Sequence, residues 1–409
     1  MEVMYYRKPL PFYSDFEVIE RKGEGHPDTL SDGLAEELSR AYSNYTLEHF
    51  GVVLHHNFDK VGLLGGASQV SFGRGIMKKP IRVLINGRAS DRLGDEMIPV
   101  KEIILETTNR YLKEKLPLID VEKDLEYHFN LSTASSPGRI LTDGDLDGSR
   151  AYWFSPRSKK DIQETKVLFS NDTSAGCAHY PLSDTENLVI LIEKSLNSKE
   201  YKQSRPWLGS DIKIMACRTG TNIDITMCIP QIANYVPDLE AYKSNLEEVR
   251  EYVLFLCNKY FPAYKVQLYT NTRDKYDVPE LYLTAIGSSI ESGDEGLVGR
   301  GNRINGTISI CRPFSIEGAW GKNPVYHVGK LYNMVAYLIA KDISEKLGTP
   351  VEVFIISQSG RKLMDPWKVL INYHANDINE NELNKIVEKN MQSIPDLTKR
   401  LLSGDLNIY

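Results

Sequence analysis

A histidine, a proline and an aspartate, His26-Pro27-Asp28, stand where a helix is expected to begin near the N-terminus. Two preceding glycines let the backbone approach a ligand closely, and proline suits a first helical turn, where its missing N–H is no loss. Leucines at every fourth position then form one face, and Asp32 follows Asp28 by four residues on another side. The helix start therefore presents an imidazole and a metal-competent carboxylate at an end biased toward anions. A plain helix start with solvated capping residues is the alternative.

Four further segments carry more charged groups than turns and strands need. Glycines beside arginines and lysines can bind a polyphosphate, because backbone amides and cationic side chains together offset several negative charges. Neither standard phosphate loop, GxxxxGK(S/T) or GxGxxG, occurs in the chain, so ATP would bind without them. The charged candidates are Asp172 in 168–176, Asp211 and Lys213 in 210–213, Asp294, Arg300 and Arg303 in 293–303, and Lys322 and Lys330 in 321–330.

Each of these segments also has a purely structural interpretation. Asp211 and Lys213 lie two residues apart at an expected strand start, share a face, and could form a surface ion pair worth about 0–1 kcal/mol. The 293–303 segment could be a glycine-rich turn with solvated arginines. The order of the segments along the chain favours a binding site more than any single segment does.

The size and composition of the chain restrict its class. At 409 residues it is too long for one core, so two or three domains are expected. A net charge of -6 argues against a general nucleic-acid binder. The five cysteines are scattered without a CxxC pair, which suits free thiols in a reducing compartment and excludes zinc-ribbon spacing. No apolar stretch approaches the roughly 20 residues of a membrane span, and we expect a cytoplasmic protein that binds neither membrane nor nucleic acid.

Amphipathic helices alternate with strand-rich stretches and must position these residues. A hairpin is expected from Ile212–Arg218 to Ile223–Ile229, around a turn at 219–222. The Gly-, Ser- and Asp-rich stretch 131–160 is typical of a long functional loop; its 143–148 pattern resembles a calcium loop but lacks the final glutamate. Helices are expected at about 27–49, 101–115, 183–200, 238–260, 324–347 and 380–403, and strands at Val61–Leu64, Ile81–Asn86, Leu125–Leu131, Leu281–Ile286 and Val351–Ser357.

The order of these motifs resembles the methionine adenosyltransferases, also called S-adenosylmethionine synthetases, and most closely the archaeal type. The resemblance runs from Glu20 to the C-terminus, and 293–334 is its most specific part. It implies an α+β protein of three similar α+β domains around a pseudo-threefold axis, with sheets packed at a homodimer interface and active sites between subunits. The implied domains are discontinuous: 1–24 with 183–289, 25–130 with 290–330, and 131–182 with 331–409.

The reaction that the resemblance implies is attack of the L-methionine sulfur on C5′ of ATP. The displaced triphosphate is then cleaved to pyrophosphate and phosphate. Sulfur is a good nucleophile, so this step needs orientation and stabilisation of the leaving charge rather than a general base. The resemblance implies Mg²⁺ as cofactor and leaves a need for K⁺ open. By similarity, His26 contacts the bridging oxygen, Lys213, Arg300 and Lys322 the triphosphate, Asp28 the Mg²⁺, Asp172 and Asp211 the nucleoside, and Asp294 the methionine ammonium, with Arg303 and Lys330 among the substrate-binding residues.

Three places differ from the pattern of that family. Ala175 stands where an aromatic residue is usual, Trp320 where a small polar residue is usual, and the 131–160 stretch lacks Ile-Gly-Gln-Gly. If the first two turns face each other, Trp320 would fill the volume that Ala175 leaves. These differences keep two alternatives open: the same transfer to a methionine analogue or another nucleophile, and an inactive nucleotide-binding paralogue. The presence of His26 argues against the second, because a binding module does not need it.

Overall fold

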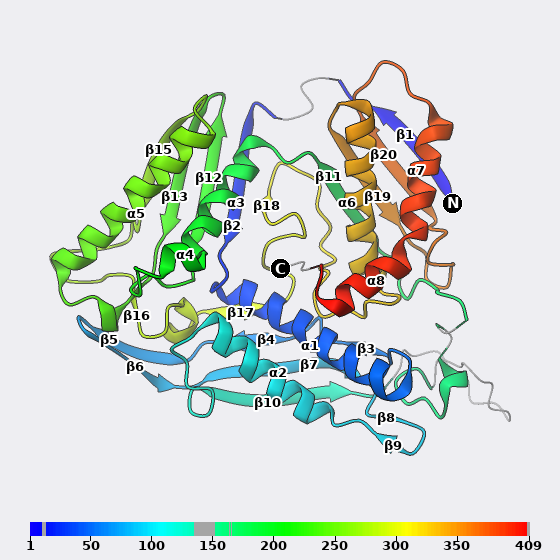
Figure 1. Cartoon of the computed structure of the whole chain (residues 1–409), viewed down its shortest axis with the longest axis horizontal. Coiled ribbons are helices and arrows are strands. Elements are labelled where there is room, and N and C mark those ends of the chain that lie inside the picture. Colours follow the sequence, from blue (N-terminus) through cyan, green and yellow to red (C-terminus); the bar gives the residue numbers. More distant parts are fainter. Residues whose placement is uncertain (10–13, 135–151, 163, 165, 407–409) are drawn as a thin grey trace.

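Three multi-stranded β-sheets, each with helices packed against it, make up most of the chain in the computed structural model (Figure 1). The structure describes residues 1–9, 14–134, 152–162, 164 and 166–406. Each sheet has its own cluster of buried hydrophobic side chains. The chain is therefore a mixed α+β protein, as expected. The 143–148 pattern lies outside the described residues.

The first sheet lies beneath the two helices drawn in blue and cyan in Figure 1. Leu30, Leu34 and Leu38 of α1 are fully buried against it, which confirms the expected leucine face. Helix α1 ends where Gly51 adopts a φ of 69°, a left-handed conformation that favours glycine. The strand order is β10-β7-β4-β17 with β3 also paired to β7: β3 (His56–Asn57), β4 (Gly62–Leu64), β7 (Ile81–Ala89), β10 (Leu125–Ser132) and β17 (Glu295–Leu297), with α1 (Pro27–Phe50) and α2 (Val100–Lys115).

The second sheet contains the expected hairpin. Strands β12 and β13 pair antiparallel from Lys213 opposite Cys228 to Thr219 opposite Asn222, around a two-residue turn in which Gly220 has a φ of 56°. The hairpin prediction is confirmed, with a shorter turn than expected. The order is β15-β13-β12-β2-β18: β2 (Phe16–Lys22), β12 (Lys213–Thr219), β13 (Asn222–Cys228), β15 (Lys265–Thr270) and β18 (Ile308–Ser309), with α3 (Asp184–Asn197), α4 (Lys199–Lys202) and α5 (Leu239–Tyr260).

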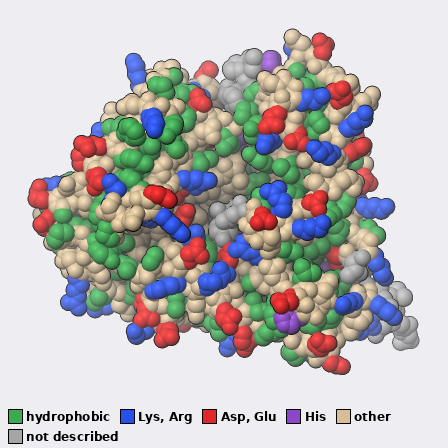
Figure 2. Space-filling view, in the orientation of Figure 1, with side chains coloured by type: hydrophobic (Ala, Val, Ile, Leu, Met, Phe, Trp, Pro, Cys, Tyr) green, Lys and Arg blue, Asp and Glu red, His purple; other side chains and the backbone are tan. Residues whose placement is uncertain are grey.

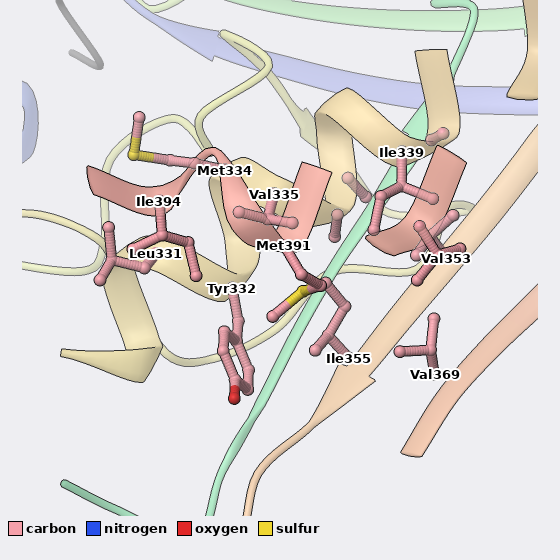
Figure 3. Close-up of a cluster of buried hydrophobic side chains, with 14 of the residues drawn as sticks. Leu331, Tyr332, Met334, Val335, Ile339, Val353, Ile355, Val369, Met391 and Ile394 are labelled. Carbon is pink, nitrogen blue, oxygen red and sulfur yellow. The ribbon is translucent and has the colours of Figure 1, made fainter. Parts of the chain in front are cut away.

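The third sheet joins the two ends of the chain. Strand β1 pairs parallel with β20, so Glu2–Arg7 lies in the sheet of the C-terminal residues, not in the sheet of 183–289 with which 1–24 was grouped. Figure 3 shows the core here, where α6 side chains meet Val353 and Ile355 of β19. The order is β1-β20-β19-β11: β1 (Glu2–Arg7), β11 (Ala175–Tyr180), β19 (Val351–Ile356) and β20 (Lys368–Tyr373), with α6 (Val328–Leu347), α7 (Glu380–Gln392) and α8 (Ile394–Ser403).

Several expected elements differ in extent from the observed ones. The helix expected at 324–347 begins only at Val328, because His327 supplies the N-cap and its Nδ1 accepts the Gly329 N–H. The helix expected at 380–403 breaks at Ser393, two residues before a proline that suits a new first turn. The strand expected at 281–286 shrinks to Leu283–Thr284 (β16).

Acidic and basic side chains are interspersed over the face of the molecule in Figure 2. Among the described residues, no helix combines the length and apolar character needed to cross a bilayer. The remaining elements of the described chain are short: β5 (Ala67–Ser71), β6 (Arg74–Lys79), β8 (Arg92–Leu93), β9 (Glu96–Met97), β14 (Gln231–Ile232), η2 (Lys159–Asp161), η4 (Ala233–Tyr235) and η5 (Ser289–Ser292).

Candidate active site

His26 caps the N-terminus of α1. Its Nδ1 accepts the backbone N–H of Asp28 at 3.1 Å, and its backbone is extended, as an N-cap requires. Burial lowers the pKa of His26, against the opposing effect of the nearby Asp211 carboxylate. The imidazole is therefore neutral, and because Nδ1 accepts, its proton lies on Nε2. His26 can donate one hydrogen bond at a helix end that favours anions.

The Asp28 carboxylate is buried and already has partners on both oxygens. Oδ1 accepts the Leu297 N–H at 3.0 Å, and Oδ2 lies 2.8 Å from Nζ of the buried Lys22. Arg300 Nε approaches Oδ1 to 3.8 Å. Among the described residues, no group of three or more His, Cys, Asp or Glu side chains is placed to hold a metal ion. Each carboxylate oxygen has a second lone pair, so Asp28 fits a Mg²⁺ whose other ligands are phosphate oxygens and water.

Lys213, Asp211 and Asp294 lie close to the same helix start. Lys213 is 40% exposed, and its Nζ lies 3.0 Å from Oε1 of Glu20, so it forms an ion pair with Glu20 and not the surface pair expected with Asp211. Asp211 is buried and accepts the N–H of Ser289 at 2.9 Å. The Ser289 Oγ lies 2.6 Å from Asp211 and 3.0 Å from Asp294, and so links these two carboxylates. We call the set His26, Asp28, Asp211, Lys213, Asp294 and Arg300 the start group.

A second set of candidates lines a cavity of about 810 Å³. Lys322 is buried at its wall, paired with Glu317 and 4.0 Å from Asp59. Asp172 reaches the same cavity from the exposed turn before β11. We call Lys322 and Asp172, with the other cavity-lining residues, the cavity group. It also includes His56, Asn57, Asp59, Lys60, Asn86, Gly87, Arg88, Trp153, Phe154, Asn171, Val298, Gly299, Ile316, Glu317, Gly318, Trp320, Tyr326 and His327.

The two groups lie apart on one chain, although both were expected to contact one triphosphate. The Ser39 Oγ donates to the Lys322 carbonyl at 3.1 Å, which places Lys322 beside the middle of α1. Ser39 follows Pro27 by 12 residues along α1, a distance of about 18 Å at about 1.5 Å per residue. The structure therefore brings six expected residues together at the helix start and two at the cavity, and Val298 and Gly299, which precede Arg300, also line that cavity.

Arg303 and Lys330 are engaged inside the protein. Lys330 is fully buried, with Nζ 2.6 and 2.7 Å from the two carboxylate oxygens of Glu36. Arg303 donates to the carbonyls of Gly299 and Gly301 at 2.5 and 2.8 Å. Burial lowers the pKa of Arg303. Both cations therefore have partners within the protein, and their contact with substrate, which the resemblance implies, stays a prediction.

The expectation that Trp320 fills a void left by Ala175 is wrong. Ala175 begins β11 and is exposed, so its small side chain leaves no buried void. Its carbonyl accepts the Ser315 hydroxyl at 2.6 Å. Trp320 is 1% exposed, belongs to the third core, and has the Arg303 guanidinium 5.4 Å from its ring centre.

Sequence reasoning missed several charged residues that lie beside the candidates. Lys22 and Glu20 alternate on β2 just before His26, so the two-residue period could have placed both on the face of Lys213. Asp59 and Lys60 line the cavity from the turn between β3 and β4, and Arg88 lines it from β7, and no local pattern marks them.

Comparisons with known proteins identify the family of the chain. Residues 3–405 match the family model for S-adenosylmethionine synthetase (AdoMet synthetase). The chain is 38% identical to the S-adenosylmethionine synthase of Hyperthermus butylicus over 407 residues, 96% of this chain and 95% of that protein. Identity to the synthases of Thermoplasma acidophilum and Haloarcula marismortui is 37% and 35%, over 97% of this chain and 96% and 95% of theirs.

A solved structure supports the fold. It is described as an unusual S-adenosylmethionine synthetase from Campylobacter jejuni, and it superposes with a TM-score of 0.61 at 13% identity, covering 94% of this chain and 88% of that one. The chain therefore belongs to the S-adenosylmethionine synthetase family.

Proposed function

We propose that the chain synthesises S-adenosylmethionine from ATP and L-methionine, at a site that the start group of one subunit and the cavity group of another form together. Membership of the family supports the reaction. The observation that carries the site is a neutral His26, held as an N-cap, among Lys22, Lys213 and Arg300. A donor among cations at a helix N-terminus suits a leaving polyphosphate.

The start group would act on the leaving group. As the C5′–oxygen bond breaks, negative charge grows on the bridging oxygen, and a hydrogen bond from His26 Nε2 strengthens with it. Lys213 and Arg300 offset charge on the triphosphate as it departs. A Mg²⁺ held by Asp28 would supply further phosphate neutralisation when bound. The protein thus contributes orientation and fixed positive charge, and the methionine sulfur needs no base.

The separation of the two groups supports a homodimer. The backbone of Lys322 lies beside Ser39, about 18 Å along α1 from Pro27, and we propose that the two groups meet across subunits rather than within one chain. A two-fold axis would bring the start group of each subunit to the cavity group of its partner, giving two equivalent sites. We expect the interface to bury more than about 2,000 Å², as obligate dimers do.

We also infer three α+β domains related by a pseudo-threefold axis. Three sheets with three separate cores support this division, with β1 moved to the C-terminal domain by its pairing with β20. Strand β18 (Ile308–Ser309) belongs to the sheet of 183–289, and the discontinuous segments 1–24 with 183–289, 25–130 with 290–330, and 131–182 with 331–409 are otherwise retained.

The working conditions follow from the same proposal. We expect dependence on Mg²⁺, with K⁺ as a candidate second cation, and a cytoplasmic setting. The five cysteines are all free thiols, which supports a reducing compartment.

Mass spectrometry of the products tests the function. The protein is incubated with ATP, Mg²⁺ and each of a panel of thioethers, including methionine and ethionine. We expect S-adenosylmethionine, pyrophosphate and phosphate with methionine. Product with another thioether alone would support the analogue hypothesis, and no product with any of them would support an inactive nucleotide-binding paralogue.

A further inference from the structure

Three acidic residues on α1, spaced by four, reach from the helix to backbone amides of two glycine-containing loops. Asp28 accepts the Leu297 N–H at 3.0 Å. Asp32 accepts two, Gly299 N–H at 2.7 Å and Gly301 N–H at 3.1 Å. Glu36 accepts the Gly321 N–H at 3.1 Å. All three carboxylates are buried, and we call Asp28, Asp32 and Glu36 the acidic row.

The amides that the acidic row holds are adjacent to the expected triphosphate-binding cations. Arg300 lies between Gly299 and Gly301, so Asp32 fixes the backbone on both sides of it. Lys322 directly follows Gly321, whose amide Glu36 holds. The side chain of Arg300 is 67% exposed, so its position depends mainly on that of its backbone.

The backbone of the loops lies closer to α1 than residues with side chains would allow. A Cβ on Gly296 would lie 1.9 Å from the Pro27 carbonyl oxygen, and one on Gly301 would lie 2.1 Å from Asp32 Oδ2. Gly321 has a φ of 72°, a conformation that favours glycine. Glycine is therefore needed at these positions so that carboxylate and amide can meet.

Three basic side chains offset the negative charge of the acidic row. Lys22 pairs with Asp28 and Lys330 with Glu36. The positive charge of Arg303 favours the ionised form of Asp32, although burial raises the pKa of Asp32 to about 8. Lys330 and Arg303 therefore offset negative charge on the carboxylates that hold the loops.

We infer that Asp32 and Glu36 are positioning residues, which set the cations Arg300 and Lys322 at the active site by holding the backbone of their loops. The inference rests on the proposed function for what these cations bind. Asp32 does not touch substrate and acts through Arg300. One helix thereby sets the position of cations in both the start group and the cavity group.

Asp32→Asn tests the inference, because an amide side chain keeps one acceptor oxygen and must lose one of the two loop amides. We expect kcat for S-adenosylmethionine formation to fall about 10- to 100-fold, as small misplacements of a catalytic group do, with KM for methionine changed less than about twofold. Gly301→Ala keeps the carboxylate and displaces the loop, and it should lower kcat similarly. Asp238→Asn is the matched control: this carboxylate accepts the Ala241 N–H at 2.8 Å as the N-cap of α5, outside both loops, and its replacement should leave kcat within about twofold.

The double variant Asp32→Asn/Arg300→Ala separates positioning from a general structural role. If Asp32 acts through Arg300, the double variant should have nearly the kcat of Arg300→Ala alone. Multiplied losses in the double variant would overturn the inference, as would retention of more than half of kcat by both Asp32→Asn and Gly301→Ala. Failure of the wild-type protein to form S-adenosylmethionine would instead contradict the proposed function.

Discussion

The start group and the cavity group differ in how their side chains are surrounded. At the start of α1, Asp28 and Asp211 are buried and hydrogen-bonded, so the cations around His26 stand in a prearranged network. The cavity group instead surrounds about 810 Å³ of open space, with Lys322 buried at its wall and Asp172 exposed. A prearranged network suits a leaving group whose charge changes during reaction, and an open cavity suits the bulk of a substrate.

The histidines of the two groups show the same contrast. His26 uses Nδ1 in its helix cap, which assigns its proton to Nε2. His56 is fully buried and both its nitrogens have protein partners: Nδ1 lies 3.0 Å from the Leu54 carbonyl and Nε2 lies 2.8 Å from Ser39 Oγ. The comparison therefore predicts a chemical role for His26 and a structural one for His56.

The largest effect on stability is expected at Lys330. Lys330→Met leaves Glu36 as a buried carboxylate without its cation, which should lower the free energy of unfolding by about 3–5 kcal/mol. Chemical denaturation measures the change. Lys399→Met removes an exposed pair with Asp396 and should cost less than about 1 kcal/mol. Equal losses in the two variants would show that the Lys330–Glu36 pair contributes no more to stability than an exposed ion pair.

Lys213→Ala should affect catalysis much more than folding. Its ammonium faces the start group and is 40% exposed, so its loss removes charge stabilisation of the leaving triphosphate with little change in packing. We expect kcat to fall about 10²–10³-fold, with the melting temperature nearly unchanged. Turnover above half of wild type at saturating substrate would show that Lys213 does not stabilise the leaving triphosphate.

His26→Asn tests the role of the Nε2 donor. Asparagine is also a good N-cap, so α1 should still begin at Pro27. We expect adenosyl transfer to slow about 10²-fold, because the donor to the bridging oxygen is lost, while hydrolysis of added triphosphate is much less affected. Rapid-quench measurement of the two steps decides, and equal losses in both would indicate a general binding role.

The smallest effect concerns the pH dependence of stability at His56. Burial lowers the pKa of His56 to about 3, whereas an unfolded histidine titrates near 6.5. Its contribution to stability is therefore complete above pH 6.5 and is lost as the pH falls toward 3, with about 2 kcal/mol lost at pH 5. Unfolding of wild type and His56→Gln at pH 7.5 and pH 5 measures it. The variant should lose less stability between the two pH values, and parallel losses would show that His56 does not contribute.

Local patterns in the sequence predicted local structure well. The His-Pro-Asp start, the leucine spacing of α1 and the β12–β13 alternation depend on neighbouring residues, and the structure confirms them. The parallel pairing of β1 with β20 joins the two ends of the chain, and alternation of side chains does not specify a partner strand.

The candidate site was predictable in its residue types but less so in their partners. The four-residue spacing of Asp28 and Asp32 places both on one side of α1, but it does not show that loop amides from 297–301 bind them. Lys330 has the same local signal as Lys322, a lysine after glycine, and only the packing of α6 on α1 buries it against Glu36. Long-range contacts therefore decide which of these cations is buried against a carboxylate.

Subunit complementation tests most directly whether the start and cavity groups of different chains form one site. Lys213→Ala and Lys322→Ala chains, each nearly inactive alone, are co-expressed with different tags, and the mixed dimers are assayed for S-adenosylmethionine formation. In a mixed dimer one site carries both substitutions and the other carries neither, so purified mixed dimers should have about half of wild-type activity and a random equal mixture about a quarter. Each variant co-expressed with itself is the control. Activity of the mixture no higher than that of the single variants would contradict a site shared between subunits.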